Sequence, residues 1–181
     1  MRNARTTYLN PLALALSSLL SLACLGATPP AVQERPPMAE IQVPRLTGHV
    51  NDYAKILTAE RRAELEKRLA EYEEETTHQL VVLTVPSLQG RSIDSFSLKV
   101  ASTWKIGRKG LDNGVLVTIA PSERQARIEL GVGMNRYVSD DAVSKIMSEA
   151  MIPEFRAGQF GKGLERGVER LMEECRAYKV K

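Results

Sequence analysis

The sequence predicts an α/β domain in which helices cover both faces of a small mixed β-sheet. Three observations support this fold class. Helical and strand-like apolar patterns alternate along the chain, one short run is apolar enough for burial on both faces, and two later runs are separated by a four-residue turn. A strand, a helix and a second strand should form a parallel, right-handed crossover. The later pair should form an antiparallel hairpin.

The first half of the domain is expected to contain a helix, a strand and a second helix. An amphipathic helix starts after the N-cap Thr58 and reaches Glu75. Residues 79–86 are rich in Leu, Val and Thr, which is typical of a buried strand. Ser92 can cap the second helix, which leads into the glycine-rich loop 107–114.

The second half is expected to contain a hairpin and two helices. Strands at 115–120 and 125–132 flank the turn. A helix begins after the N-cap Ser139 and is expected to stop near Pro153. The last helix carries an apolar stripe that ends at Cys175.

Residues 1–27 have the pattern of a secretory signal peptide. Two arginines precede an uncharged apolar stretch that is shorter than the about 20 residues a spanning helix needs. Cleavage after Ala27 is one prediction. The alternative is lipoprotein processing at Cys24, because residues 22–24 resemble the end of a bacterial lipobox. We therefore expect an exported protein, either periplasmic or lipid-anchored to the cell envelope.

Composition places one folded domain behind a linker. Residues 28–47 are rich in proline and read as an extended tether, so the domain is expected at 48–178. The chain has 25 Lys and Arg against 22 Asp and Glu, and loss of the signal arginines leaves it close to neutral. Neither nucleic acid nor an acidic membrane surface is therefore expected as a partner. Two cysteines form no disulfide framework, and we expect a monomer.

Most catalytic signatures are absent from the sequence. There is no Gly-x-Ser-x-Gly elbow, no P-loop and no His-Glu-x-x-His motif. Gly131 and Gly133 follow a strand but lack the third glycine of a dinucleotide fingerprint, so a strand-end turn explains them better. His49 and His78 stand alone in sequence, and structural or surface roles are expected for them rather than zinc binding.

The loop 107–114 is the most informative segment. Its Asp112-Asn113-Gly114 end places side-chain oxygens beside a residue that tolerates positive φ, which suits a ligand or a metal. The alternative is a tight helix-to-strand turn with solvated charges. Oxygen donors also stand at the ends of other predicted elements, and hard cations require such donors. The candidate metal ligands are Asp52, Asp112, Asn113, Glu129 and Asp140.

Each acidic candidate also has a structural interpretation. Asp140 and Asp141 follow Ser139 in the first turn of a predicted helix, where negative charge complements the helix dipole, and we favour capping for both. Glu129 lies within a predicted strand, and the alternative is that it occupies a solvent face.

Several segments, taken in order, resemble the TPM domain family. The family name joins a thylakoid lumen protein, a photosystem II repair protein and a nematode receptor modulator. The resemblance covers about residues 46 to 176. The segments that carry it are Val50–Ala54, Leu57–Glu60, Trp104–Gly107, Asp112–Leu116, Arg127–Gly133 and Pro153–Phe160.

This resemblance implies a three-layer α/β/α sandwich, which matches the element order above. It also implies divalent metal binding, weak acid phosphatase activity or assistance to membrane protein complexes. Carried over by position, the metal cleft would involve Asp52, Asp112 and Asn113, with Glu129 and Asp140 as weaker candidates. The chain departs from the family where Met134-Asn135 stands in place of a frequent Glu.

Two functions follow as expectations. The preferred one is an envelope-facing accessory module that recognises an envelope or membrane protein and binds calcium more readily than magnesium. Its membrane contact is expected only through the N-terminus, because many bacterial relatives continue into a transmembrane helix that is not seen here. The alternative is a metal-assisted phosphomonoesterase in which Arg108 or Lys109 binds the phosphate. No nucleophile for it is identifiable, and those two residues otherwise serve as solubilising charges.

Overall fold

The computed structural model describes residues 40–177 and contains one four-stranded mixed sheet in the order β1-β2-β3-β4. Strand β1 (Val50–Asp52) is parallel to β2 (Gln79–Thr84), which is parallel to β3 (Gly114–Ala120). Strand β4 (Gln125–Leu130) is antiparallel to β3. The predicted parallel pairing and the antiparallel hairpin are thus confirmed. Strand β1 was not predicted, because three residues are too few to show an alternating pattern.

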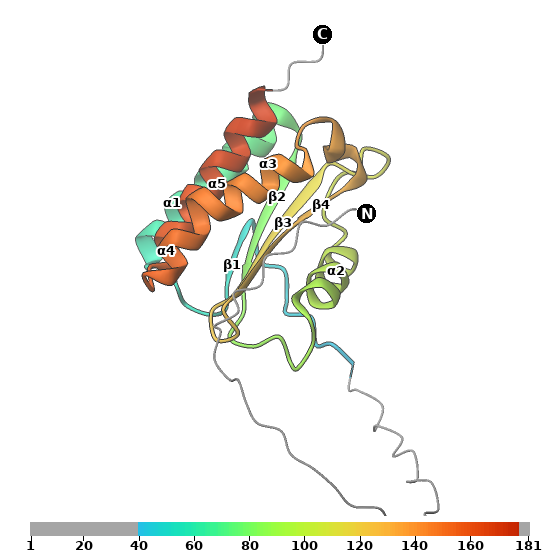
Figure 1. Cartoon of the computed structure of the whole chain (residues 1–181). Helices are drawn as coiled ribbons and strands as arrows, with labels where there is room; N and C mark the ends of the chain where they lie inside the picture. Colours follow the sequence, from blue (N-terminus) through green and yellow to red (C-terminus); the bar gives the residue numbers. More distant parts are fainter. Residues whose placement is uncertain (1–39, 178–181) are drawn as a thin grey trace, which may run out of the picture. The chain divides into compact units, whose positions relative to one another are not determined.

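Helices cover both faces of this sheet, so the predicted α/β class with three layers is confirmed (Figure 1). Helix α2 (Ile93–Trp104) covers one face. The other face carries the remaining helices, which are α1 (Ala59–Thr76), α3 (Asp140–Lys145), α4 (Ile152–Arg156) and α5 (Phe160–Ala177). One face of the sheet is therefore covered much less completely than the other.

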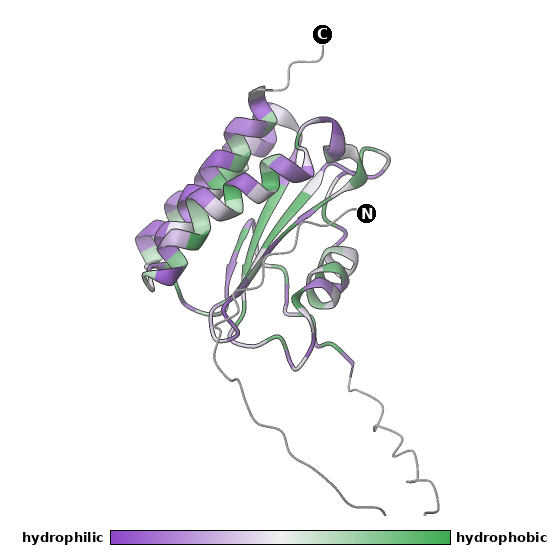
Figure 2. Cartoon of the chain, viewed as in Figure 1, coloured by the Kyte–Doolittle hydropathy of each residue, from purple (hydrophilic) through white to green (hydrophobic). Residues whose placement is uncertain are grey.

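The central strands are buried on both sides, as their composition predicts. Alternate residues of β3, such as Val117 and Ile119, enter the larger core beneath α1 and α5. Leu116 faces the smaller core, where it joins Phe96 and Val100 of α2. Figure 2 shows the apolar colouring of the central strands and the mixed colouring of α1 and α5. The two cores position the loops at the ends of the strands.

The prediction that a helix stops near Pro153 is wrong. The chain continues from α3 through the π-helical segment η2 (Ile146–Met151) directly into α4. Pro153 lies near the start of α4, directly after this π-helical segment. Because the π-helical turn absorbs the change in hydrogen-bond pattern, the helical path survives the proline.

Part of the predicted tether contacts the folded domain. Ile41 and Val43 pack against the smaller core, and Trp104 donates its indole N–H to the Pro44 carbonyl at 2.9 Å. From Ile41 onward the described residues belong to one compact unit. The signal peptide, the alternative lipidation site Cys24 and most of the tether lie outside the described residues. Within residues 40–177, no helix has the length and apolar character needed to span a membrane.

Candidate functional site

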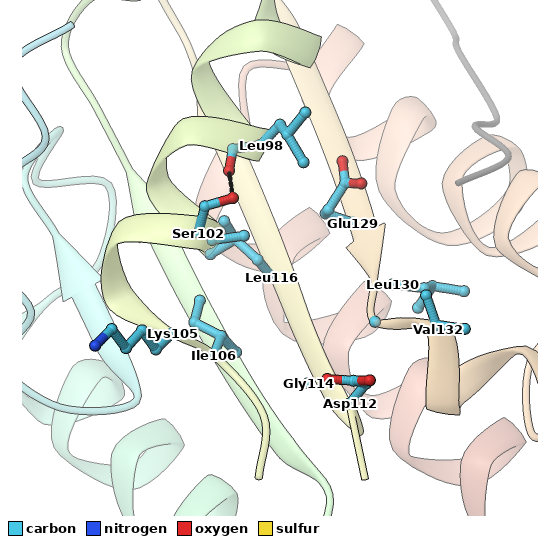
Figure 3. A pocket seen from close by; sticks show the side chains of 12 residues that line it. Leu98, Ser102, Lys105, Ile106, Asp112, Gly114, Leu116, Glu129, Leu130 and Val132 are labelled. Carbon is cyan, nitrogen blue, oxygen red and sulfur yellow. Dashed lines mark hydrogen bonds between the residues drawn. The ribbon is translucent and has the colours of Figure 1, made fainter. Parts of the chain in front are cut away.

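A cleft of about 320 Å³ lies between α2 and the adjoining ends of β3 and β4 (Figure 3). Its lining combines apolar side chains with two carboxylates. One wall comes from α2 and the residues after it, which are Leu98, Ala101, Ser102, Lys105 and Ile106. The other comes from the strand ends, which supply Asp112, Gly114, Leu116, Glu129, Leu130, Gly131 and Val132.

Asp112 has an unusual backbone conformation and an unused carboxylate. Its φ of 47° lies in the left-handed region that non-glycine residues seldom adopt. Its N–H donates to the Arg108 carbonyl at 3.0 Å, and its own carbonyl accepts the Gly133 N–H at 3.0 Å. Among residues 40–177, no hydrogen bond or ion pair engages its carboxylate. The backbone of Asp112 is therefore held firmly while its side chain stays available.

Two glycines make this arrangement possible. A Cβ atom at Gly131 would lie 2.1 Å from the Asp112 carbonyl oxygen, and one at Gly133 would lie 1.8 Å from that of Leu111. No other residue type permits such an approach. The Gly-x-Gly pair thus packs the end of β4 against the loop that carries Asp112, in agreement with the strand-end turn inferred from sequence.

Asn113 stabilises the loop that carries Asp112 and does not line the cleft. Its amide oxygen accepts the Arg108 N–H at 2.9 Å, and its NH₂ group donates to the Thr77 carbonyl at 2.7 Å. The residue is only 4% exposed. Asn113 therefore connects the loop to the end of α1 and has no oxygen facing a ligand in the cleft.

Glu129 is buried and paired, so the alternative that it occupies a solvent face is wrong. Its Oε2 lies 2.6 Å from Nε of Arg127, whose guanidinium also bonds to Asp94 of α2. Arg127 is only 3% exposed. The sequence contained a signal for this pair that our predictions missed, because residues two apart on a strand share a face. Arg127 balances much of the negative charge of Glu129.

Asp52 lies at the opposite end of the sheet from Asp112. In the parallel register Asp52 is level with Thr84 and Ile119, whereas Asp112 precedes the first residue of β3. At about 3.3 Å per residue, the two ends of β3 are separated by roughly 20 Å. The Asp52 carboxylate accepts the Ile56 and Leu57 N–H groups at 3.1 and 3.0 Å and the Thr84 hydroxyl. Asp52 therefore shapes its own loop and cannot share a ligand with Asp112.

The remaining candidates also lie away from the cleft. Asp140 and Asp141 occupy the first turn of α3, after a serine N-cap that accepts the Ala142 N–H, as the capping interpretation predicts. Arg108 is half exposed, with a guanidinium nitrogen 4.0 Å from Glu73. Neither Arg108 nor Lys109 lines the cleft. The predicted phosphate-binding pair therefore belongs to the same loop as Asp112 but not to the lining that Asp112 and Glu129 share.

The described residues fit the predicted metal site poorly. Of the five candidate ligands, only Asp112 and Glu129 line the same cleft, and Arg127 already engages Glu129. Within residues 40–177, no three His, Cys, Asp or Glu side chains are grouped to hold a metal. Calcium takes six to eight oxygens, so an ion here would rely mainly on water and backbone carbonyls.

Comparison with known proteins identifies the family. A family model described as TPM domain matches residues 50–174. The N-terminal domain of a P. gingivalis protein is 30% identical, with a TM-score of 0.66 over 71% of this chain and 82% of that one. The BA42 protein from the psychrophilic bacterium Bizionia argentinensis is 25% identical, with a TM-score of 0.60 over 67% of this chain and 83% of that one.

A third solved structure supports the fold alone. The N-terminal domain of the cg2496 protein from Corynebacterium glutamicum is 14% identical, with a TM-score of 0.57 over 80% of this chain and 93% of that one. No curated protein matches the chain. Because the family model covers all four strands and nearly all of the helices, this chain belongs to the TPM domain family.

Proposed function

We propose that this TPM-domain protein is an exported binding module of the cell envelope, which holds a segment of an envelope or membrane protein in the cleft between α2 and β4. The observation that carries the proposal is an available Asp112 carboxylate in a cleft with exposed apolar side chains. Val132 is 61% exposed and Leu98 is 38% exposed, and both line the cleft. Large exposed apolar side chains that gather around a cleft are typical of interaction surfaces.

The charges of the cleft indicate the chemistry of the partner. Arg127 is shared between Glu129 and Asp94, whereas the carboxylate of Asp112 has no counterpart among the described residues. Lys105 also lines the cleft, but its ammonium group points away from Asp112 (Figure 3). A partner segment with a basic side chain next to an apolar one would complement this surface.

The cleft gives the phosphatase alternative little support. Its lining includes neither histidine nor cysteine. Its one hydroxyl, on Ser102, donates to the Leu98 carbonyl of the same helix at 2.8 Å. With Asp52 at the other end of the sheet, no pair of groups in the cleft resembles a nucleophile and its base.

Binding of a divalent cation stays a prediction, and its candidate side-chain ligands are narrowed to Asp112 and Glu129. Calcium is preferred to magnesium because it accepts irregular sets of carboxylates, carbonyls and waters, whereas magnesium demands near-octahedral geometry. The proposed binding of a partner protein does not depend on this ion, because the exposed side chains of Val132 and Leu98 and the carboxylate of Asp112 are present without it.

Site-specific photocrosslinking tests the proposal. A photoreactive amino acid replaces Val132 in the full chain, which is expressed in its native host, and the crosslinked envelope protein is identified by mass spectrometry. We expect a defined crosslinked peptide that contains Lys or Arg. The product should be lost when Leu98→Ser or Asp112→Asn is added.

The matched control is Leu46→Ser. Leu46 has the same 38% exposure as Leu98 but does not line the cleft. The control should keep the crosslink. A crosslink that survives both cleft substitutions, or that Leu46→Ser removes equally, would contradict this function.

A further inference from the structure

A second cavity, of about 490 Å³, lies where the β3–β4 turn meets the corner between α4 and α5. The turn contributes Pro121, Ser122, Arg124 and Gln125, and the corner contributes Phe155, Arg156, Gly158 and Phe160. These corner residues belong to the segment Pro153–Phe160, one of the motifs that carry the family resemblance. The cleft at the other end of the sheet makes no use of this segment.

The charge around this cavity is positive. Arg124 and Arg156 are its only ionisable lining residues. The 18-residue helix α5 starts at Phe160 with no acidic residue in its first turn, so the positive end of its dipole adds to the two guanidinium groups.

Two acidic residues are close to the lining arginines in sequence, but neither lines the cavity. Glu123 accepts the Leu88 N–H at 2.7 Å with one oxygen. Glu154 is bound by Arg166 and lies 3.2 Å from the Lys162 ammonium nitrogen. Neither carboxylate lines the cavity, although the second oxygen of Glu123 is buried without a hydrogen-bond partner. Because the lining itself holds two arginines and no acidic residue, the cavity favours a negatively charged ligand.

An apolar wall stands beside the two arginines. The rings of Phe155 and Phe160 stack with centroids 5.5 Å apart and planes inclined by 29°. Pro121 completes this wall. Guanidinium groups bind oxyanions through paired N–H donors, and aromatic faces bind flat apolar groups. A ligand that carries both an oxyanion and a flat apolar group would contact the two arginines and the apolar wall together.

We propose that this cavity binds a small organic oxyanion, in which a phosphate or carboxylate group is joined to an apolar body. The cavity lies at the carboxyl end of β3, and ligands of open α/β sheets commonly bind outside the carboxyl ends of the strands. Its lining lacks a carboxylate, histidine or cysteine, so the inference concerns binding without turnover.

Calorimetric titration of the purified full chain tests the ligand class. Phenyl phosphate and benzoate serve as probes. Inorganic phosphate and acetate supply each oxyanion without the ring, and phenol supplies the ring without the oxyanion. We expect an intact probe to bind at least about tenfold more tightly than either half, because the guanidinium contacts and the apolar wall both contribute. Preference for phenyl phosphate assigns a phosphate, and preference for benzoate assigns a carboxylate. Failure of both probes to bind overturns the proposal.

Charge-removing substitutions locate the binding site. Arg124→Gln and Arg156→Gln should each weaken binding by about tenfold or more. Arg124→Gln is the decisive variant, because Arg156 also takes part in another interaction. Unchanged melting temperatures will show that both variants stay folded.

Two controls separate this cavity from the rest of the molecule. Arg108→Gln removes an exposed arginine at the other end of the sheet and should leave probe binding unchanged. Asp112→Asn should do the same, so loss of partner crosslinking at the cleft and loss of probe binding here are distinguishable. Weaker binding in Arg108→Gln together with normal binding in Arg124→Gln would overturn the proposal.

Discussion

At one end of the sheet the carboxylate of Asp52 accepts three hydrogen bonds, whereas at the other end the carboxylate of Asp112 accepts none from residues 40–177. Both residues are aspartates in loops beside strand ends. They differ in whether the carboxylate itself holds the loop in place. The loop after β1 is held by the Asp52 carboxylate, whereas the loop before β3 is held by backbone contacts with glycines and by the side chain of Asn113. An acidic residue in a loop is therefore a candidate for binding only where the backbone does not use its carboxylate.

The first prediction concerns Arg127, where the largest effect is expected. Arg127→Met should destabilise the domain by about 3–5 kcal/mol, because it leaves the buried carboxylate of Glu129 without its partner. Urea denaturation would measure the loss. The double variant Arg127→Met, Glu129→Met should recover much of it. If the double variant is as unstable as the single one, then lost packing explains the effect better than charge.

The glycines beneath Asp112 provide the second prediction. Gly133→Ala should destabilise by roughly 1–3 kcal/mol, because its Cβ would lie 1.8 Å from the Leu111 carbonyl oxygen and force the loop to move. Gly110→Ala is the matched control in the loop that carries Asp112, since a Cβ there meets nothing within 4 Å. Its positive φ of 82° still costs some strain. A smaller loss for Gly133→Ala than for Gly110→Ala would show that close packing does not hold Asp112.

A calcium titration sharpens the comparison between the two ends. A cation at the cleft should stabilise the folded chain by about 1.4 kcal/mol at a tenfold excess over Kd. Asp112→Ala should abolish the resulting rise in melting temperature. Asp52→Ala should keep the rise, although its baseline melting temperature will be lower. If Asp52→Ala also abolishes the rise, then the two ends of the sheet are coupled through the ion.

Glu66 offers a smaller, pH-dependent test, because it resembles Asp52 in accepting backbone N–H groups. Partial burial alone would raise the pKa of Glu66, but the N–H groups of His49 and Val50 and the His49 side chain lower it overall. A lowered folded-state pKa means that this stabilisation is complete above the usual value near 4.5 and is lost as the pH falls through the folded-state value. Glu66→Gln should therefore flatten the stability profile below pH 4.5, as followed by thermal melting. An unchanged profile would contradict this role.

Much of the fold could be predicted from local patterns. The helices, β2 and the β3–β4 hairpin follow from apolar periodicity and turn residues. Strand β1 was missed because it is short, and the stop at Pro153 was wrong because a π-helical turn accommodates the proline. These errors arise where tertiary packing outweighs a local signal.

The candidate site was less predictable, because it depends on which strand ends meet. The sequence identified Asp112 and Glu129, which line one cleft, but it grouped them with Asp52, and only the parallel register shows that separation. The pairing of Arg127 with Glu129 could have been predicted from their spacing of two along the strand. The cavity beside Phe155 could not be predicted from the sequence, because it joins a turn and a helix corner that are distant in sequence.

The most direct test of the account compares Asp112→Asn with Asp52→Asn in the same two assays, thermal melting and crosslinking from position 132. Asparagine keeps the size of each side chain and tolerates the positive φ of residue 112. Asp52→Asn should lower the melting temperature by roughly 5–10 °C and keep the crosslink, because it weakens charge-assisted hydrogen bonds worth about 2 kcal/mol. Asp112→Asn should leave the melting temperature within about 2 °C and lose the crosslink. The opposite pattern, in which Asp112→Asn unfolds the domain and keeps the crosslink, would contradict the account.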